Sequence, residues 1–267
     1  MPRMKLDYYQ VNAFTNRPFA GNPAGVCILD RWLPERQLQA IAAENNLSET
    51  AFIVPRSPDF ELRWFTPKTE IDLCGHATLA SAFVLFNERK IAGQVVRFQS
   101  CRSGVLTVAR RGELLELDFP ARPPEPSHAP DGLVIALGAQ PIETMRARDY
   151  LCVYEDEAAV RALQPDFAKL LTLDLHGVIV TAPGTDCDFV SRFFAPSVGV
   201  PEDPVTGSAH CTLIPYWSRR LDKTTLFARQ VSRRGGELFC SNAGERVCIG
   251  GHAVLYCRGE IFVPDPV

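Results

Sequence analysis

Short runs in which apolar and polar residues alternate, separated by turns rich in glycine and proline, cover most of the 267-residue chain. Alternation with a period of two is typical of strands that have one buried face. Strands are predicted at residues 6–14, 26–29, 51–55, 60–65, 95–98, 104–108 and 114–119, and further along at 133–137, 150–154, 178–181, 189–194, 237–240, 246–249 and 251–263. The pattern therefore predicts a β-rich protein.

Three segments have the spacing of helices instead. Residues 34–45 place Leu38, Ile41 and Ala42 on one face, and the segment begins at a proline, which is tolerated in the first turn of a helix. Residues 75–89 and 207–220 are apolar on nearly every face. A helix of that kind has to be buried all round, so we expect two central helices, each wrapped by strands.

A proline-rich stretch divides the chain. Residues 120–130 contain five prolines, and proline interrupts both helices and central strands. We therefore predict a linker at residues 121–130. It separates an N-terminal lobe at residues 1–120, completed by the last strand near 255–267, from a C-terminal lobe at 131–254.

A weak internal repeat relates the two predicted lobes. In each lobe a strand ends in the pattern Phe-x-Pro, at Phe65–Pro67 and at Phe194–Pro196. An acidic loop follows, and then a glycine, Gly75 or Gly207, opens an apolar helix. Two copies of one unit predict two similar lobes, and chance similarity over so short a pattern is the open alternative.

Composition argues against several classes of function. The formal net charge is −3, and the arginine pairs are scattered rather than gathered into the basic stripe of a nucleic-acid-binding protein. We find no run of ~18 apolar residues and no signal peptide, so we expect no membrane association and a cytoplasmic location. The nine cysteines form no CxxC pair and lack metal-ligand spacing, which predicts neither a disulfide framework nor a bound metal.

The glycines that open the two apolar helices are candidate anion sites. Unpaired backbone N–H groups and the helix dipole both favour an anion at a helix N-terminus. On this interpretation Gly75 and Gly207 would hold a carboxylate and an enolate-like oxygen. Two ordinary helix starts explain the same residues equally well.

Several ionisable side chains stand at the starts of apolar elements. Glu49, after Ser48, begins an apolar strand, where partial removal from water suits a general base; a capping or surface glutamate is the commoner alternative. His76 lies in the first helical turn, where the dipole is expected to lower its pKa and keep it neutral, and a structural histidine is the alternative. Asp203 is either a reacting carboxylate or a turn residue, and Cys74 is either a thiolate or an inert buried thiol.

Four blocks of sequence resemble, in order, those of the PhzF-like family of phenazine biosynthesis. They are Val11–Thr15 with Phe19–Gly25, Asn46–Phe52, Arg63–Pro67 with Asp72–Thr78, and Phe194–Pro196 with Glu202–His210. Together they span residues 11 to 210, and beyond them only the strand pattern is similar. The resemblance implies an α+β fold similar to diaminopimelate epimerase. That fold has two pseudo-symmetric lobes, each a β-barrel-like sheet around a central helix, with the active site between them.

The resemblance also implies functional residues. In the phenazine enzyme a glutamate in the Ser-Glu-Thr block removes a proton from carbon and returns one elsewhere, and Glu49 matches that glutamate. His76 and Asp203 match the family's other catalytic positions. The positions that match substrate contacts are Ser48, Gly75, Gly207 and Ser208. A homodimer is implied as well, while the residues that select the substrate stay open among candidates such as Arg17, Lys68 and Arg192.

Related epimerases and racemases use two cysteines as acid and base. Cys74 stands at the first of these positions, but residues 203–207 contain no cysteine, and Cys211 comes several residues later. The resemblance therefore favours a mechanism centred on Glu49 over a two-thiol racemase.

The expected activity is that of a cofactor-independent isomerase, with no metal, that moves a proton between carbons of a small carboxylate-bearing substrate. One alternative is a racemase, epimerase or dehydratase acting on amino or hydroxy acids. Another is a noncatalytic small-anion-binding protein on the same scaffold. Glu49 favours an enzyme, because a carboxylate beside an anion site would repel the ligand of a pure binder.

Overall fold

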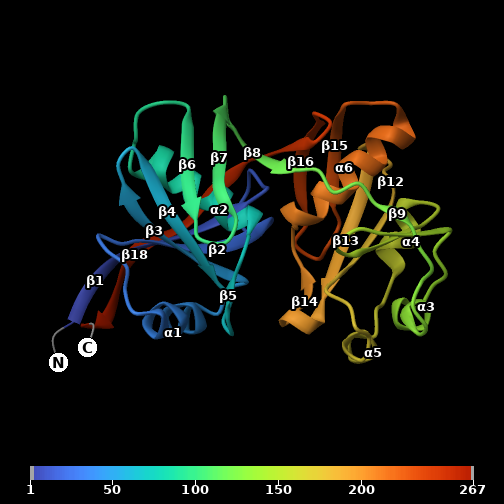
Figure 1. Ribbon diagram of the computed structural model, residues 1–267, viewed down its shortest axis with the longest axis horizontal. Helices are drawn as coiled ribbons and strands as arrows, with labels where there is room; N and C mark the ends of the chain where they lie inside the picture. The colour runs from blue at the N-terminus through green and yellow to red at the C-terminus, as the bar shows by residue number, and fades with distance from the viewer. Residues whose placement is uncertain (1–2, 266–267) are drawn as a thin grey trace. The chain divides into compact units, whose positions relative to one another are not determined.

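The computed structural model describes residues 3–265, which form two compact units. Unit 1 contains the residues up to Asp118 together with those from Gly250 onward, and unit 2 is Phe119–Ile249. The first and last strands therefore belong to the same unit, and Figure 1 shows them, in blue and red, side by side.

Unit 1 is a set of strands with two main helices. Its elements are β1 (Arg3–Ala13), β2 (Asn22–Ile28), α1 (Glu35–Asn45), β3 (Glu49–Arg56), β4 (Asp59–Phe65), β5 (Glu70–Ile71), α2 (Gly75–Phe83), a π-helix (Val84–Glu88), β6 (Val95–Ser100), β7 (Gly104–Arg111), β8 (Leu114–Pro120) and β18 (Ala253–Pro264). β1 pairs antiparallel with both β18 and β2. Every residue of α2 from 75 to 82 is buried, as expected for a central helix.

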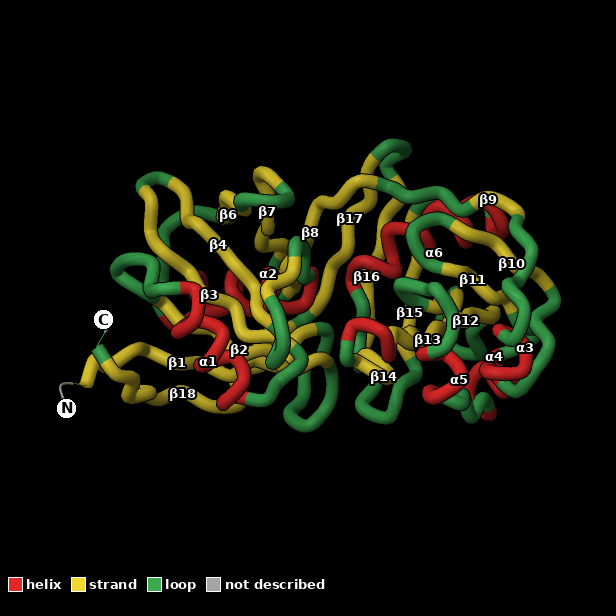
Figure 2. Tube along the Cα trace, turned by 60° about the horizontal axis from the view of Figure 1, so that its bottom comes forward, coloured by secondary structure: helices red, strands yellow, loops and turns green. Residues whose placement is uncertain are grey.

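Unit 2 is built in the same way. Its elements are β9 (Glu125–Pro126), α3 (Leu133–Leu137), β10 (Glu143–Arg146), β11 (Tyr150–Val153), α4 (Glu157–Ala162), α5 (Phe167–Leu171), β12 (Val178–Pro183), β13 (Phe189–Ala195), a 3-10 helix (Pro196–Val198), β14 (Val200–Asp203), α6 (Gly207–Leu221), β15 (Thr225–Gln230), β16 (Gly236–Asn242) and β17 (Arg246–Gly251). Most residues of α6 are buried, and Figure 2 distinguishes its helix from the neighbouring strands by colour.

The strand pairings repeat one topology in both units. In unit 1, β2 pairs parallel with β3, β3 and β5 pair antiparallel with β4, and β6 pairs parallel with β4. In unit 2, β11 pairs parallel with β12, β12 and β14 pair antiparallel with β13, and β15 pairs parallel with β13. In each case the buried helix, α2 or α6, connects the short strand to the parallel one. The repeat read from the sequence is therefore a repeat of strand order.

Some predicted elements differ from the structure. Residues 133–137, predicted as a strand, form helix α3, whose flanking glycines Gly132 and Gly138 both have positive φ. Leu133, Ala136 and Leu137 are buried at helical spacing.

The predicted helix at 75–89 continues from α2 into the π-helix. In the predicted linker, Glu125 and Pro126 form β9 and pair with β10, so the proline-rich stretch does contribute to a sheet. Among the described residues, no helix is long and apolar enough to cross a membrane.

Candidate functional site

Glu49 is the first residue of β3 and is positioned by the parallel pairing of this strand with β2. It lies opposite Ala24 in that pairing, and the next five residues of β3 are completely or almost completely buried. The Glu49 side chain is only 11% exposed. The apolar strand therefore removes the carboxylate largely from water, which agrees with the first of the two interpretations that the sequence left open for Glu49.

His76 faces this carboxylate from the first turn of α2. Its Nε2 lies 3.1 Å from Oε2 of Glu49, and its side chain is 5% exposed. Helix α2 packs against β2 and β3, which brings the two groups together from separate elements. A buried carboxylate and an imidazole at this distance can exchange a proton.

Asn22, at the start of β2, completes the arrangement and was not among the predicted site residues. It is fully buried, and its Nδ2 donates a hydrogen bond to Nδ1 of His76 over 3.1 Å. A neutral imidazole that accepts at Nδ1 carries its proton on Nε2, the nitrogen that faces Glu49. The sequence offers a weak signal for this residue, because an asparagine between Gly21 and Pro23 is also typical of a turn.

The charges around His76 reverse the pKa direction predicted from the helix dipole. Burial lowers the pKa of His76, but the neighbouring Cys74 and Glu49 more than offset burial and hold it well above its usual range. The prediction of a lowered pKa is therefore wrong, because the dipole argument included neither Cys74 nor the Glu49 carboxylate from β3.

Cys74 is the residue before α2, and its Sγ lies 3.4 Å from Nδ1 of His76. Burial and the charge of Glu49 raise the pKa of this thiol to about 11. Cys74 is thus a neutral, buried thiol near neutral pH, which agrees with the less reactive of its two predicted states.

We expect the substitution Asn22→Leu to lower turnover by roughly tenfold, because losing a buried hydrogen-bond partner costs about 1–3 kcal/mol. If Asn22 acts only through its contact with His76, kcat should fall while KM stays unchanged. Steady-state kinetics on the wild type and the variant measure this. A change confined to KM would show that Asn22 binds substrate instead.

Glu49, Cys74 and His76 also present one donor atom each within 4.8 Å of one another. A cysteine, a histidine and a carboxylate are a ligand set that Zn²⁺ accepts. The sequence predicts no metal, and that statement stays a prediction. The same groups also suit proton transfer, because Nε2 of His76 lies 3.1 Å from Oε2 of Glu49.

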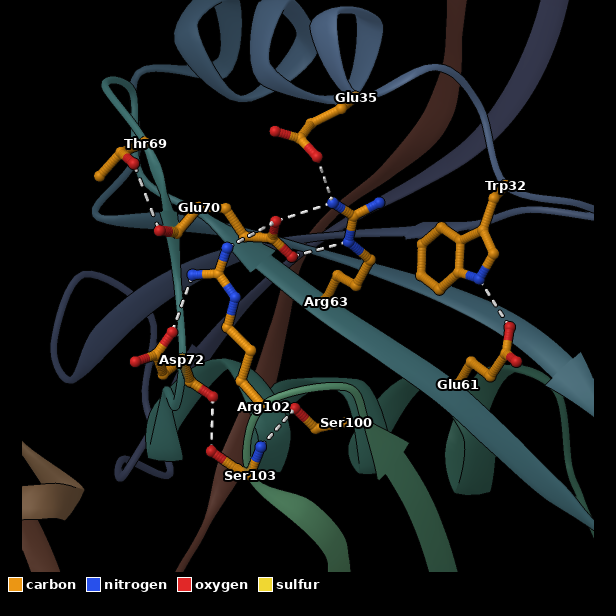
Figure 3. Close-up of polar contacts among 10 residues, drawn as sticks. All are labelled: Trp32, Glu35, Glu61, Arg63, Thr69, Glu70, Asp72, Ser100, Arg102 and Ser103. Carbon is orange, nitrogen blue, oxygen red and sulfur yellow. Dashed lines mark hydrogen bonds and ion pairs between the residues drawn. The ribbon is translucent and has the colours of Figure 1, made fainter.

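Ion pairs anchor the segment that leads into α2 (Figure 3). Arg63 donates to both carboxylate oxygens of Glu70 over 2.7 Å, and its guanidinium lies over the ring of Phe65. Arg102 Nη1 donates to Asp72 over 2.8 Å, and Ser103 Oγ donates to the backbone carbonyl of Asp72. These contacts hold the residues at 70 and 72, shortly before α2 begins at Gly75.

In unit 2, Asp203 and the start of α6 are joined by a buried glutamine. Asp203 Oδ2 accepts a hydrogen bond from Oγ1 of Thr206, the residue before the helix. Gln230, 1% exposed at the end of β15, accepts from the Thr206 N–H and donates to the Asp203 carbonyl, each over 2.8 Å. The sequence analysis did not predict a role for Gln230, because nothing around residue 230 indicates that its side chain contacts the residues just before α6.

The remaining predicted residues lie close to these groups within their own units. Gly207 and Ser208 are the first two residues of α6, with Ser208 partly exposed. Gly75 precedes His76 in α2, and Ser48, partly exposed, precedes Glu49. The structure thus gathers Ser48, Glu49, Gly75 and His76 in unit 1, and Asp203, Gly207 and Ser208 in unit 2. The placement of one active site between the lobes stays a prediction.

Arg192 is unsuited to selecting a substrate. It lies on β13, makes two hydrogen bonds to Glu202, over 2.7 and 3.0 Å, and donates to the carbonyls of Val160 and Leu163. Its side chain is 11% exposed, so its donors are used within the fold. Arg17 and Lys68 are exposed and remain candidates for this role.

His210, the fourth residue of α6, is a buried histidine of a different kind. Its Nδ1 donates to the Thr206 carbonyl, and its Nε2 has no hydrogen-bond partner in the described part of the chain. Burial lowers its pKa to about 4. It is therefore neutral near pH 7 and serves the packing of α6 rather than proton transfer.

Acid should destabilise the protein through His210. An unfolded histidine takes up a proton near pH 6.5, whereas the folded one does so only at about 4, so the unfolded chain binds more protons between these values. As the pH falls through this window, the free energy of unfolding of the wild type should decrease by about 1.4 kcal/mol per pH unit more than that of His210→Gln. Urea denaturation across the window measures both slopes, and equal slopes would contradict the assignment.

Comparison with known proteins agrees with this arrangement. The family described as phenazine biosynthesis-like protein matches residues 11–259. An uncharacterized isomerase of Pseudomonas aeruginosa is 56% identical over 97% of this chain and 100% of its own length. A crystal structure from the phenazine biosynthesis protein PhzF family of Enterococcus faecalis has a TM-score of 0.94 and is 51% identical, covering 97% of this chain and 100% of that chain.

A more distant structure extends the likeness of the fold alone. A hydroxyproline epimerase from Agrobacterium vitis has a TM-score of 0.61 at 11% identity, covering 98% of this chain and 94% of that one. The predicted epimerase-like α+β fold is thereby confirmed, and the isomerase class follows from the curated relative. The chain therefore belongs to the phenazine biosynthesis-like family of proteins and is an isomerase.

Proposed function

We propose that the protein is a cytoplasmic, cofactor-independent isomerase that moves a proton between two carbons of a small carboxylate-bearing substrate. One observation carries this proposal: the Glu49 carboxylate lies 3.1 Å from the His76 imidazole, and both are buried at the N-terminus of an apolar helix. A carboxylate and an imidazole in contact are a base and an acid that can work in sequence.

In the proposed reaction the Glu49 carboxylate takes a proton from a C–H bond next to an electron-withdrawing group of the substrate. The electron pair of that bond moves onto the substrate and gives an enolate-like anion. The backbone N–H groups at the start of α2 would stabilise this charge. A different carbon then receives a proton from Glu49 or His76, so the charge balances without a redox change.

The electrostatics of the pair support His76 as a donor in the second step. Because the pKa of His76 is held well above its usual range, the ring can hold a second proton near neutral pH, and in that state both ring nitrogens donate. The Asn22 amide would then turn its oxygen towards Nδ1, since its nitrogen can donate only to the neutral ring. The charged ring can give up the proton on Nε2, the nitrogen that faces Glu49, and it takes up none while it carries two.

Epimerisation at a single carbon is the second candidate, because the Cys74 thiol lies beside His76 and adds another proton-carrying group. A mechanism with two thiols has less support. Thr206 occupies in α6 the position that Cys74 occupies before α2, and Cys211 is 1% exposed inside the helix.

Proton NMR in D₂O tests the proposal. The protein is mixed with a panel of small cyclic and linear amino and hydroxy acids, and deuterium incorporation at each carbon is followed. Deuterium at a carbon other than the one deprotonated supports a shift between carbons, and deuterium at one stereocentre supports epimerisation. Binding without exchange by any compound would overturn the catalytic proposal in favour of an anion-binding protein.

A further inference from the structure

Glu49, Cys74 and His76 are a candidate metal-binding group within unit 1. Among residues 3–265 they are the one set of three or more histidine, cysteine or acidic side chains whose ligand atoms all lie within 4.8 Å of one another. Glu49 lies on β3, whereas Cys74 and His76 lie at the start of α2, and Figure 1 labels both elements in the same unit. None of the three residues is more than 9% exposed, so these ligand atoms are held largely away from water.

The distances between the three ligand atoms are close to those of a tetrahedral zinc site. With Zn–N and Zn–O bonds of about 2.0–2.1 Å and a Zn–S bond of about 2.3 Å, tetrahedral angles place two ligand atoms roughly 3.3–3.6 Å apart. Nε2 of His76 lies 3.1 Å from Oε2 of Glu49 and 4.0 Å from Sγ of Cys74. Side-chain shifts of about 1 Å are therefore enough to place all three atoms around one ion.

A buried carboxylate oxygen of this group has no hydrogen bond. Oε2 of Glu49 accepts none from any other residue of the described chain, although Nε2 of His76 lies 3.1 Å away. The ring N–H therefore does not point directly at this oxygen. A buried charged oxygen without a hydrogen bond is costly, and a cation held between the carboxylate and the imidazole would satisfy it.

We propose that Glu49, Cys74 and His76 bind one Zn²⁺ ion through Oε2, Sγ and Nε2, and that the bound ion blocks proton transfer at this site. On binding, the Cys74 thiol gives its proton to solvent, and His76 keeps a single proton, on Nδ1. The bonds to the ion then use the electron pairs with which Glu49 and His76 would accept a proton. Zn²⁺ is thus an inhibitor rather than a cofactor, and its effect on the rate rests on the proposed function.

Asn22 would support the bound state from the other side of the His76 ring. A metal-ligating histidine usually donates its second ring N–H to a neighbouring acceptor, which orients the ring. Nδ1 of His76 lies 3.1 Å from the side-chain amide of Asn22, and this amide presents its oxygen after a half-turn. The fold therefore already holds an outer partner for the proposed ligand.

The ligand set favours Zn²⁺ over Mg²⁺ and Ca²⁺. A thiolate and a carboxylate together balance the two positive charges of the ion, so the buried group is neutral once the ion is bound. Mg²⁺ and Ca²⁺ take six or more ligands, nearly all of them oxygen, and this group offers neither the number nor the type. Three protein ligands leave a fourth position, which water fills in zinc sites of this kind.

Metal titration of the full-length protein without substrate tests the binding step. The protein is treated with EDTA, dialysed and titrated with Zn²⁺ in competition with a chromophoric chelator. We expect one ion per chain, removed again by excess EDTA. Co²⁺ in place of Zn²⁺ should give the near-ultraviolet charge-transfer band of a thiolate ligand together with the visible bands of a tetrahedral site, and Mg²⁺ should compete with neither ion.

Variants locate the site. Cys74→Ser should remove the charge-transfer band and weaken Zn²⁺ binding by at least about tenfold, whereas Glu49→Gln should weaken binding but keep the band. Asn22→Leu, which removes only the acceptor for Nδ1, should weaken binding by roughly 10- to 100-fold. Cys101→Ser is the matched control, because Cys101 is exposed, and it should change nothing. No band in the wild type, or equal Zn²⁺ affinity in Cys74→Ser and the wild type, would overturn the proposal and show adventitious binding only.

The rate of substrate proton exchange separates this inference from the proposed function. Exchange should fall in proportion to the fraction of protein that holds Zn²⁺ and return in full with EDTA. Exchange without any Zn²⁺ binding would overturn this inference and leave the proposed function in place, whereas Zn²⁺ binding to a protein without exchange activity would do the reverse. An exchange rate that stays unchanged or rises when the site is filled would overturn the inhibitory role of the ion.

Discussion

Replacing Glu49 with glutamine is expected to lower the rate of substrate proton exchange by roughly 10³-fold, within the range that a general acid or base contributes. Glutamine keeps the shape of the side chain at the start of β3 but cannot accept the proton. The side chain is 11% exposed and faces His76, so few water molecules can take over its role. Deuterium incorporation followed by proton NMR under identical conditions measures the two rates.

The controls separate lost chemistry from lost structure. Glu44→Gln changes an exposed glutamate of α1 and should leave the exchange rate unchanged. Glu49→Asp keeps a carboxylate but shortens it, so a partial rate should return. Near-wild-type exchange in Glu49→Gln would remove this residue from the mechanism, and a variant whose urea midpoint falls sharply would point to a structural role instead.

The sequence predicted the chemical groups of the candidate site better than their electrostatics. Glu49 at the start of an apolar strand and His76 in the first turn of an apolar helix are both visible in the order of residues. Their distance is not, because β3 and α2 are brought together by packing on β2. The predicted pKa direction of His76 was wrong because the helix-dipole argument left out two neighbours that raise this pKa, Cys74 before the helix and Glu49 on β3.

The same distinction explains which elements of the fold were predictable. The central helices α2 and α6 are apolar all round, and a pattern of that strength has one main interpretation. Helices α3, α4 and α5 have only five or six residues, too few for a helical period to be told from a strand. In α3 the deciding features are the positive φ angles of Gly132 and Gly138, which follow from the surrounding structure.

The internal repeat extends to a buried ion pair that the sequence alone does not reveal. In unit 1, Arg63 on β4 binds Glu70 with two hydrogen bonds and lies over Phe65, two residues further along its strand. In unit 2, Arg192 on β13 binds Glu202 in the same way and lies over Phe194. Each pair links the strand that ends in Phe-x-Pro to the short strand that leads to a central helix. The arginines therefore support the loops that precede α2 and α6.

Arg192→Met is accordingly expected to lower the free energy of unfolding by about 3 kcal/mol, because it leaves the Glu202 carboxylate without its cation and two backbone carbonyls without their donor. Urea denaturation of the wild type and the variant measures the loss.

Arg229→Met is the matched control. Arg229 also lies over a phenylalanine and pairs with Glu237, but its side chain is 37% exposed. We therefore expect this variant to lose less than about 1 kcal/mol of unfolding free energy. Equal losses in the two variants would mean that the buried pair is no more important than a surface one. A large loss confined to Arg192→Met would show that this arginine supports the fold around the loop before α6.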